Sequence, residues 1–291
     1  MYETALLHGA LGEAPGEFVD AQGVRVHFVR WGQGSPVVYV HGAKTSAFDF
    51  LLSIGDAVAE RHTAVAFDRP GSGFSGRPEG VSGSPQVQAA VLRATAAELG
   101  VDRPVLVGHS FGAAVALAWA LAAPEDVAAV VTLGGYVVPL GGPPPWVVAL
   151  LRSRATIKAL GAFARSRAGQ PLVRSALKRA FYPDPVPEEY ARLLPALALE
   201  ESRLIHDGED RKEAEAGLRA LTAGYPGLAV PLVIVVGEQD RMVPPRASLE
   251  LHRLVPGSEL VELPATGHMP HFTQPAAVLA AIERAVDRAG R

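Results

Sequence analysis

Short apolar runs alternate along most of the chain with longer segments whose apolar residues recur at helical spacing. An alternating segment at Val24–Val29 predicts an antiparallel edge strand. The continuous runs predict strands buried on both faces, at Val37–Val40, Thr63–Phe67, Pro104–Val107, Val127–Leu133, Leu232–Val236 and, more weakly, Ser258–Leu263. Helical patterns cover 46–59, 84–99, 111–123, 246–254 and 275–289. This order predicts an α/β fold with a mostly parallel central sheet flanked by helices.

The alternation is interrupted between residues 136 and 227. This segment has helical periodicity, is punctuated by prolines such as those at Pro143–Pro145, and contains no run typical of a strand. Helices inserted between two core strands predict a cap, or lid, on the sheet. We therefore expect an α/β core of residues 20–135 and 228–291 and an inserted helical cap of residues 136–227.

The clearest indication of a catalytic group is a pentapeptide between the strand that ends at Val107 and the helix that follows it. It is the only G-x-S-x-G pattern in the chain, Gly108-His109-Ser110-Phe111-Gly112. A serine on such a sharp strand-to-helix turn has a strained backbone, and glycines two residues to either side relieve the crowding. The helix N-terminus directs free N–H groups at developing negative charge. We predict that Ser110 is a catalytic nucleophile.

A serine nucleophile needs a base to take its proton, and in this type of fold the base is a histidine late in the chain. His268 follows the last predicted strand, at the sheet edge where ligands bind in open α/β sheets. We predict that His268 is the base. His271 is the alternative, but we interpret it as a hydrogen-bonded structural histidine.

The acid that orients the histidine is expected just after a strand, between the serine and the histidine in sequence. Asp240 meets this requirement, because it follows the strand at Leu232–Val236 in the turn Gly237-Glu238-Gln239-Asp240. Glu238 is the nearest competitor. Asp126 precedes its strand and is expected at the wrong end of the sheet. We predict that Asp240 is the acid.

Hydrolysis through a tetrahedral intermediate also needs two N–H donors for the oxyanion. The N–H of Phe111, directly after the nucleophile, is the first candidate. The second is expected in the loop after the strand ending at Val40. We favour the N–H of Ala43, although the sequence does not firmly separate it from Gly42.

Together these segments resemble the capped serine hydrolases of the α/β-hydrolase superfamily. The resemblance covers the two parts of the predicted core but not the cap, and it rests on His41-Gly42, Asp68-Arg69-Pro70-Gly71-Ser72-Gly73-Phe74-Ser75, the pentapeptide around Ser110, Gly237-Glu238-Gln239-Asp240 and Gly267-His268-Met269-Pro270-His271. In relatives, the cap shapes the substrate pocket. Epoxide hydrolases and haloalkane dehalogenases of the family have an aspartate in place of Ser110, which argues against both activities.

Composition narrows the remaining possibilities. The net charge is −3 and no basic stripe is present, so nucleic acid is not an expected partner. The absence of cysteine removes disulfides, thiol nucleophiles and cysteine-ligated metals. Neither Gly71–Gly76, which matches G-x-G-x-x-G but has no helix after it, nor the His268/His271 pair has the context of a dinucleotide or metal site. We expect neither cofactor nor metal.

The resulting expectation is a serine esterase that acts on small to medium apolar substrates through an acyl-enzyme intermediate. Two alternatives stay open: hydrolysis of a carbon–carbon bond in a diketone-like substrate, and a ligand receptor with a slow, retained triad. The partner is then a small molecule. No apolar run is long enough for a membrane span, and the first 20 residues lack the basic start of a signal peptide, so a cytoplasmic location is expected.

Overall fold

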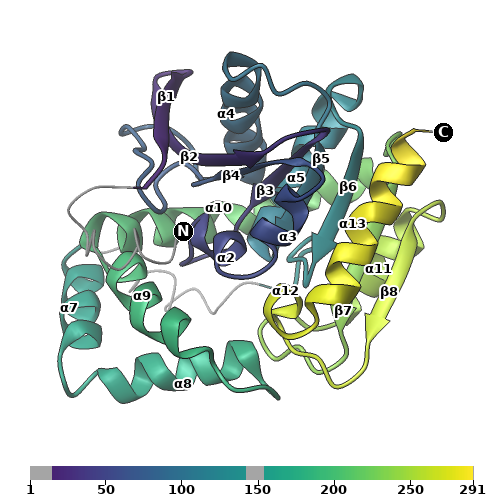
Figure 1. Cartoon of the computed structure of the whole chain (residues 1–291). Coiled ribbons are helices and arrows are strands. Elements are labelled where there is room, and N and C mark those ends of the chain that lie inside the picture. Colours follow the sequence, from purple (N-terminus) through teal and green to yellow (C-terminus); the bar gives the residue numbers. More distant parts are fainter. Residues whose placement is uncertain (1–14, 142–153, 291) are drawn as a thin grey trace.

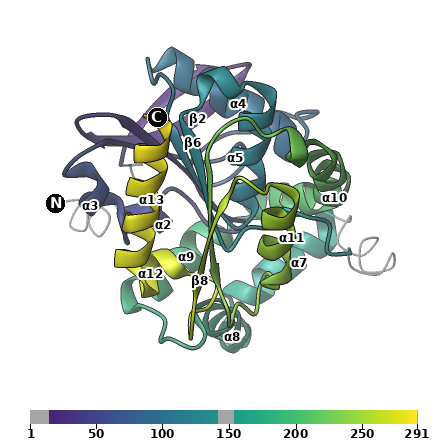
Figure 2. The same ribbon diagram turned by 90° about the vertical axis from the view of Figure 1, so that its right-hand side faces the viewer.

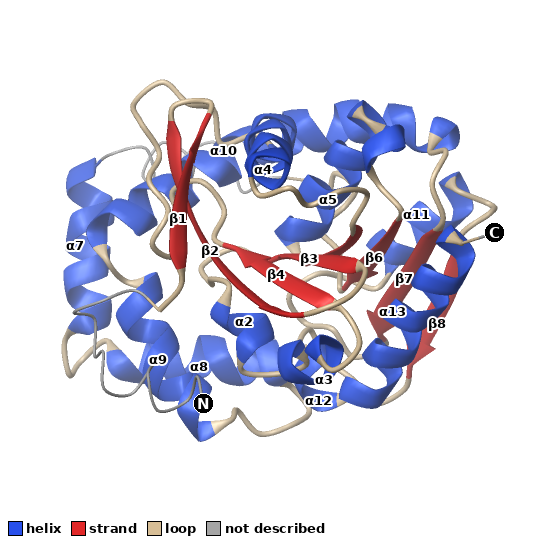
Figure 3. Cartoon of the chain, turned by 45° about the horizontal axis from the view of Figure 1, so that its top comes forward, coloured by secondary structure: helices blue, strands red, loops and turns tan. Residues whose placement is uncertain are grey.

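A central sheet organises the computed structural model, which describes residues 15–141 and 154–290 (Figures 1 and 3). The sheet has eight strands in the order β1-β2-β4-β3-β5-β6-β7-β8. β1 and β2 are antiparallel to each other and β2 is antiparallel to β4, whereas all other pairs are parallel. The strands are β1 (Glu17–Ala21), β2 (Val24–Gly32), β3 (Pro36–Val40), β4 (Thr63–Phe67), β5 (Val105–His109), β6 (Ala129–Leu133), β7 (Leu232–Gly237) and β8 (Glu259–Leu263). The predicted α/β architecture with a mostly parallel sheet is confirmed.

Two local expectations were wrong. β2, predicted as the edge strand, is covered by β1, whose residue Glu17 pairs with Phe28. The helix expected over 46–59 is divided into α2 (Phe48–Leu51) and α3 (Gly55–Ala59). At the break, the Ser53 hydroxyl donates to the Asp49 carbonyl at 2.6 Å. A serine hydroxyl that takes a backbone carbonyl in this way competes with continuation of the helix.

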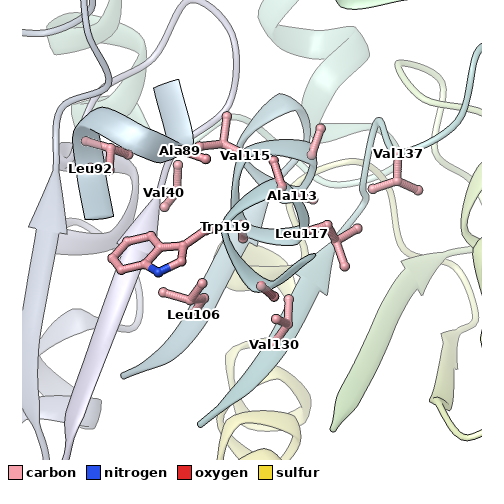
Figure 4. Close-up of a cluster of buried hydrophobic side chains, with 14 of the residues drawn as sticks. Val40, Ala89, Leu92, Leu106, Ala113, Val115, Leu117, Trp119, Val130 and Val137 are labelled. Carbon is pink, nitrogen blue, oxygen red and sulfur yellow. The ribbon is translucent and has the colours of Figure 1, made fainter. Parts of the chain in front are cut away.

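Helices cover both faces of the sheet, and each face has its own apolar core. α4 (Pro85–Glu98), α5 (Phe111–Ala122) and α11 (Arg246–Leu254) pack on one face, and α3 and α13 (Pro275–Ala289) pack on the other. Figure 2 shows α11 and α13 on opposite sides of β8. In the first core, Trp119 of α5 is buried among Leu92, Leu106 and Val40 (Figure 4). Because α5 packs between α4 and the sheet, the turn at its N-terminus is held in place.

The helical insertion between β6 and β7 comprises the described helices α7 (Arg154–Arg165), α8 (Gln170–Phe181), α9 (Glu188–Ala198) and α10 (Glu201–Gly224). Its described part contains no strand, and residues 142–153 of the predicted cap lie outside the described residues. α10 packs into the core beside α4 and α5 through Leu218 and Leu221. α8 and α9 share a smaller apolar cluster with Met269, the residue after His268. No helix in the described parts of the chain is long and apolar enough to cross a membrane. A short helix that was not predicted, α12 (Pro270–Thr273), follows Met269.

Candidate active site

Ser110 occupies a strained turn between β5 and α5. Its backbone angles are φ 52° and ψ −118°, a combination that residues with a side chain rarely adopt. The surrounding main chain holds this conformation: the Ser110 N–H donates to the Leu133 carbonyl at 2.9 Å, and the Ser110 carbonyl accepts from Ala113 at 3.1 Å and Tyr136 at 3.0 Å. Strain of this kind costs about 1–3 kcal/mol and persists only where neighbouring structure enforces it.

The glycines of the pentapeptide let the main chain approach closely on both sides of Ser110. A Cβ atom at Gly108 would lie 2.6 Å from the Ala113 Cα. A Cβ atom at Gly112 would overlap the carbonyl oxygen of Val40 in β3. The obstruction in each case is backbone, which cannot rotate away as a side chain could. Both glycines are therefore required by packing of the turn against the sheet.

Replacement of Gly112 by alanine is expected to lower the free energy of unfolding by about 2–3 kcal/mol, because the new methyl group overpacks the α5–β3 contact. Chemical denaturation measures this difference. Gly257→Ala is the matched control, since a Cβ atom at Gly257 would meet no other atom within 4 Å. Equal midpoints for the two variants would contradict the packing argument.

His268 and Asp240 form a buried pair at the ends of the neighbouring strands β7 and β8. His268 Nδ1 lies 2.7 Å from Asp240 Oδ2. The other carboxylate oxygen, Oδ1, accepts the N–H groups of Met242 at 2.7 Å and Val243 at 2.9 Å. Asp240 is 8% exposed, whereas Glu238 is an exposed residue of the same turn. The geometry therefore pairs His268 with Asp240 rather than with Glu238.

Burial lowers the pKa of His268 below its ordinary value of 6.5, because the imidazolium ion loses solvation there. The Asp240 carboxylate opposes this effect by favouring the charged ring. The net shift is downward, so the ring is neutral near pH 7. With Nδ1 donating to Asp240, the neutral ring leaves Nε2 as a free acceptor.

His109, the residue before Ser110, contacts the loop that contains His268. His109 Nε2 lies 2.9 Å from the carbonyl oxygen of His268, and the two rings are 4.8 Å apart between centroids. The structure has no hydrogen bond between Ser110 and the His268 side chain, both of which are described. Contact between Ser110 Oγ and His268 Nε2 therefore stays a prediction.

The loop after β3 lies against the nucleophile. A Cβ atom at Gly42 would be 3.1 Å from the Ser110 Cβ. Arg69 holds this loop from the other side: its Nε donates to the His41 carbonyl and its Nη2 to the Gly42 carbonyl, each at 3.0 Å. The N–H groups of Ala43 and Phe111 donate to no described residue.

A second buried polar cluster, which the sequence did not reveal, lies beside the pair. It contains Asp49, His109 and His271, whose side chains bring atoms able to ligate a metal within 4.8 Å of one another. The Tyr190 hydroxyl, from the insertion, donates to Asp49 Oδ1 at 2.9 Å. No local pattern marks Asp49 or Tyr190, because their contact depends on how the insertion packs.

The interpretation of His271 as a hydrogen-bonded histidine was wrong in one respect. His271 is fully buried, but neither of its ring nitrogens has a hydrogen-bond partner among the described residues. It packs instead on the rings of Phe50, His109 and Phe272. Burial and two neighbouring histidines hold the pKa of His271 well below its ordinary range, so the ring is neutral.

Comparison with curated proteins shows relatives with different hydrolytic activities. RutD of Klebsiella pneumoniae (strain 342), which carries the name of a carbamate hydrolase, is 30% identical over 82% of this chain and 87% of its own length. The 2-hydroxy-6-oxo-2,4-heptadienoate hydrolase of Pseudomonas putida is 26% identical over 89% of this chain and 91% of its own length.

Solved structures share the fold. An α/β-hydrolase fold protein from Burkholderia ambifaria superposes with a TM-score of 0.79 at 22% identity, over 93% of this chain and 97% of that one. An esterase from Thermogutta terrifontis gives a TM-score of 0.70 at 21% identity, over 95% and 98% of the two chains. The sequence model of the alpha/beta hydrolase family matches residues 37–281. The chain therefore belongs to the alpha/beta hydrolase family.

Proposed function

We propose that the protein is a serine hydrolase that cleaves carboxylic esters of small to medium apolar substrates. The observation that carries the proposal is the strained Ser110 at the N-terminus of α5, next to the buried His268–Asp240 pair with its 2.7 Å contact. A nucleophile, a neutral base and an acid that fixes the tautomer of the base are the parts of serine hydrolysis.

The proposed reaction begins when Ser110 Oγ attacks the acyl carbon and His268 Nε2 takes its proton. Asp240 keeps the proton on Nδ1 and stabilises the imidazolium that forms. The N–H groups of Phe111 and Ala43 bind the oxyanion. His268 then protonates the leaving alcohol, which departs and leaves the acyl-enzyme. Finally His268 activates a water molecule that releases the acid and restores Ser110.

The apolar surroundings of His268 support an apolar substrate. Met269, the next residue, is buried in a cluster with Leu177, Phe181 and Tyr190 of the insertion, and Phe272 packs against it. The buried side chains of this cluster are at most 7% exposed, so the loop that carries the base lies against an apolar core. An apolar acyl or alcohol group that binds in such surroundings gains free energy by leaving water.

Carbon–carbon bond hydrolysis is the second candidate, and the Pseudomonas putida relative favours it. The two activities separate in a substrate panel of p-nitrophenyl esters from acetate to decanoate, a p-nitrophenyl carbamate and a vinylogous diketone acid. Ester turnover with a chain-length optimum, and an acyl adduct on Ser110 in mass spectra of quenched reactions, is the expected result. Cleavage of the diketone alone would replace the ester proposal with the second candidate. Turnover of the carbamate alone would contradict both.

The pH dependence should report the base. His268 must be neutral to accept a proton, and its pKa is lowered mainly by burial. We therefore expect kcat/KM to be level near pH 7 and to fall as the pH decreases through a pKa below 6.5. Initial rates between pH 4.5 and about 8 at constant ionic strength measure this limb. Circular dichroism at each pH excludes unfolding as its cause, and a midpoint above 6.5 would contradict the assignment.

A further inference from the structure

Two chains of buried polar contacts connect the helical insertion with the loops on both sides of Ser110. The first chain starts at Tyr190 in α9 and ends at the loop that contains His268. Its hydroxyl donates to Asp49 Oδ1 at 2.9 Å, and the two residues are 4% and 1% exposed. A hydrogen bond to a buried carboxylate is stronger than one between neutral groups, and it fixes both partners. Tyr190 therefore sets the position of Asp49.

Asp49 in turn faces His109. Asp49 Oδ2 lies 3.7 Å from His109 Nδ1, while His109 Nε2 lies 2.9 Å from the His268 carbonyl oxygen. A carbonyl only accepts hydrogen bonds, so Nε2 carries the proton in this contact. No hydrogen bond joins Asp49 to His109, because 3.7 Å is too long for one and neither atom has another partner among the described residues. Both side chains are buried, and the His109 ring is packed between the Asp49 carboxylate and the main chain of His268. A shift of Asp49 would therefore change the packing of the ring that supports His268.

The insertion also reaches His268 directly. The His268 N–H donates to the carbonyl of Ala180, in α8, at 3.2 Å. His109 and Ala180 therefore hold the carbonyl and the N–H of the same residue. The side-chain pair with Asp240 completes the support, so His268 is fixed at its main chain and at its ring.

The second chain of contacts starts at Asp210 in α10 and ends at the loop after β3, which contains the predicted oxyanion donor Ala43. Asp210 Oδ2 accepts from Arg69 Nη1 at 2.9 Å, and the two residues are 3% and 1% exposed. Arg69 Nη1 also donates to Gln88 Oε1 at 2.7 Å. Its Nε and Nη2 donate to the carbonyls of His41 and Gly42. In a trans peptide the C=O and the next N–H point in opposite directions. When Arg69 binds the Gly42 carbonyl, it therefore turns the Ala43 N–H away from itself.

We propose that Tyr190 and Asp210 are positioning residues, through which the insertion sets the geometry of the base and of the oxyanion loop. This inference rests on the proposed serine-hydrolase function. Tyr190 acts through Asp49 and His109 on His268, and Asp210 acts through Arg69 on Ala43. The insertion is then part of the catalytic apparatus as well as a cover for the substrate. Loss of either contact lowers the rate of chemistry more than it weakens substrate binding.

Tyr190→Phe and Asp210→Asn test the two routes. Misplacement of a reacting group by about 1 Å can cost about a hundredfold in rate, and the loss of one supporting contact should cause a smaller shift, so we expect each variant to lower kcat about tenfold. KM should stay within about twofold, because neither residue belongs to the predicted reacting groups. The rate at which a fluorophosphonate labels Ser110 should fall in parallel. The routes share no residue, so the double variant should lose about a hundredfold.

Each variant has a control that makes the same chemical change at another site. Tyr225→Phe removes another buried hydroxyl, which donates to the Val137 carbonyl at 2.5 Å. Glu213→Gln changes a neighbouring acid of α10, whose carboxylate binds the Ser82 hydroxyl. Tyr225→Phe should lower Tm about as much as Tyr190→Phe. Glu213→Gln should lower it less than Asp210→Asn, because Asp210 is the buried counter-charge of both Arg69 and Arg77. Both controls should leave kcat unchanged. A purely structural role for Tyr190 and Asp210 would lower Tm in the test variants and leave their kcat at the native value.

The outcomes separate the inference from the proposed function. If the fluorophosphonate labels Ser110 of the native protein and the test variants react at the native rate, the positioning role is overturned and the serine-hydrolase proposal stands. If the native protein neither reacts with the reagent nor turns over any ester, the proposed function fails and the positioning role fails with it. A tenfold loss of kcat in the test variants but not in the controls establishes the role.

Discussion

Replacement of Ser110 by alanine is expected to lower kcat for ester hydrolysis by about a millionfold, the loss seen when a nucleophile that acts together with its base is removed. The binding surface and the N–H groups of Phe111 and Ala43 are unchanged by this substitution. KM should therefore change little, and a small residual rate above that in water should persist. Stopped assays at high enzyme concentration, with product measured over hours, give the required range.

Two comparisons make the result specific to the nucleophile. Ser110→Gly should be as inactive as Ser110→Ala but about 1 kcal/mol more stable, because glycine adopts the positive φ of 52° at this turn without strain. Denaturant unfolding measures that difference. If Ser110→Ala kept native turnover, Ser110 would not be the nucleophile, whatever the stability of the glycine variant.

Most of the sheet could be predicted from the sequence because its central strands, β3 to β7, are buried on both faces. Runs such as Val37–Val40 and Leu232–Val236 have no polar residue to expose, and their order along the chain selects a parallel arrangement. β1 escaped prediction for the opposite reason. Its sequence, Glu-Phe-Val-Asp-Ala, mixes polar and apolar residues because it lies at the edge and is mostly exposed.

Asp240 and His268 could be predicted to lie together because each of them follows the end of a strand. Asp240 and His268 come directly after β7 and β8, which pair in parallel, so their loops meet at one edge of the sheet. The residues of the insertion that support the site do not follow strand ends in this way, so their positions could not be predicted. Tyr190 and Asp49 are separated by 141 residues, and so are Asp210 and Arg69. Their contacts depend on the packing of the insertion, which no local pattern encodes.

The second large effect is expected from Asp240→Asn, which should lower kcat about ten-thousandfold. An asparagine keeps the size of the side chain and one carbonyl oxygen for the N–H groups of Met242 and Val243. Its amide can then face His268 as a donor, which places the ring proton on Nε2 and removes the acceptor that Ser110 requires. The lost carboxylate also leaves the imidazolium without its counter-charge.

Glu238→Gln is the matched control, because Glu238 lies two residues away in the same turn but is exposed and does not contact His268. It should retain native kcat and native pH dependence. A reversal, with Glu238→Gln inactive and Asp240→Asn active, would assign the acid to the competing carboxylate. Because Asp240 also raises the pKa of His268, any residual activity of Asp240→Asn should extend to lower pH than that of the native protein. A change in rate without this shift would mean that Asp240 orients the ring but contributes little charge to it.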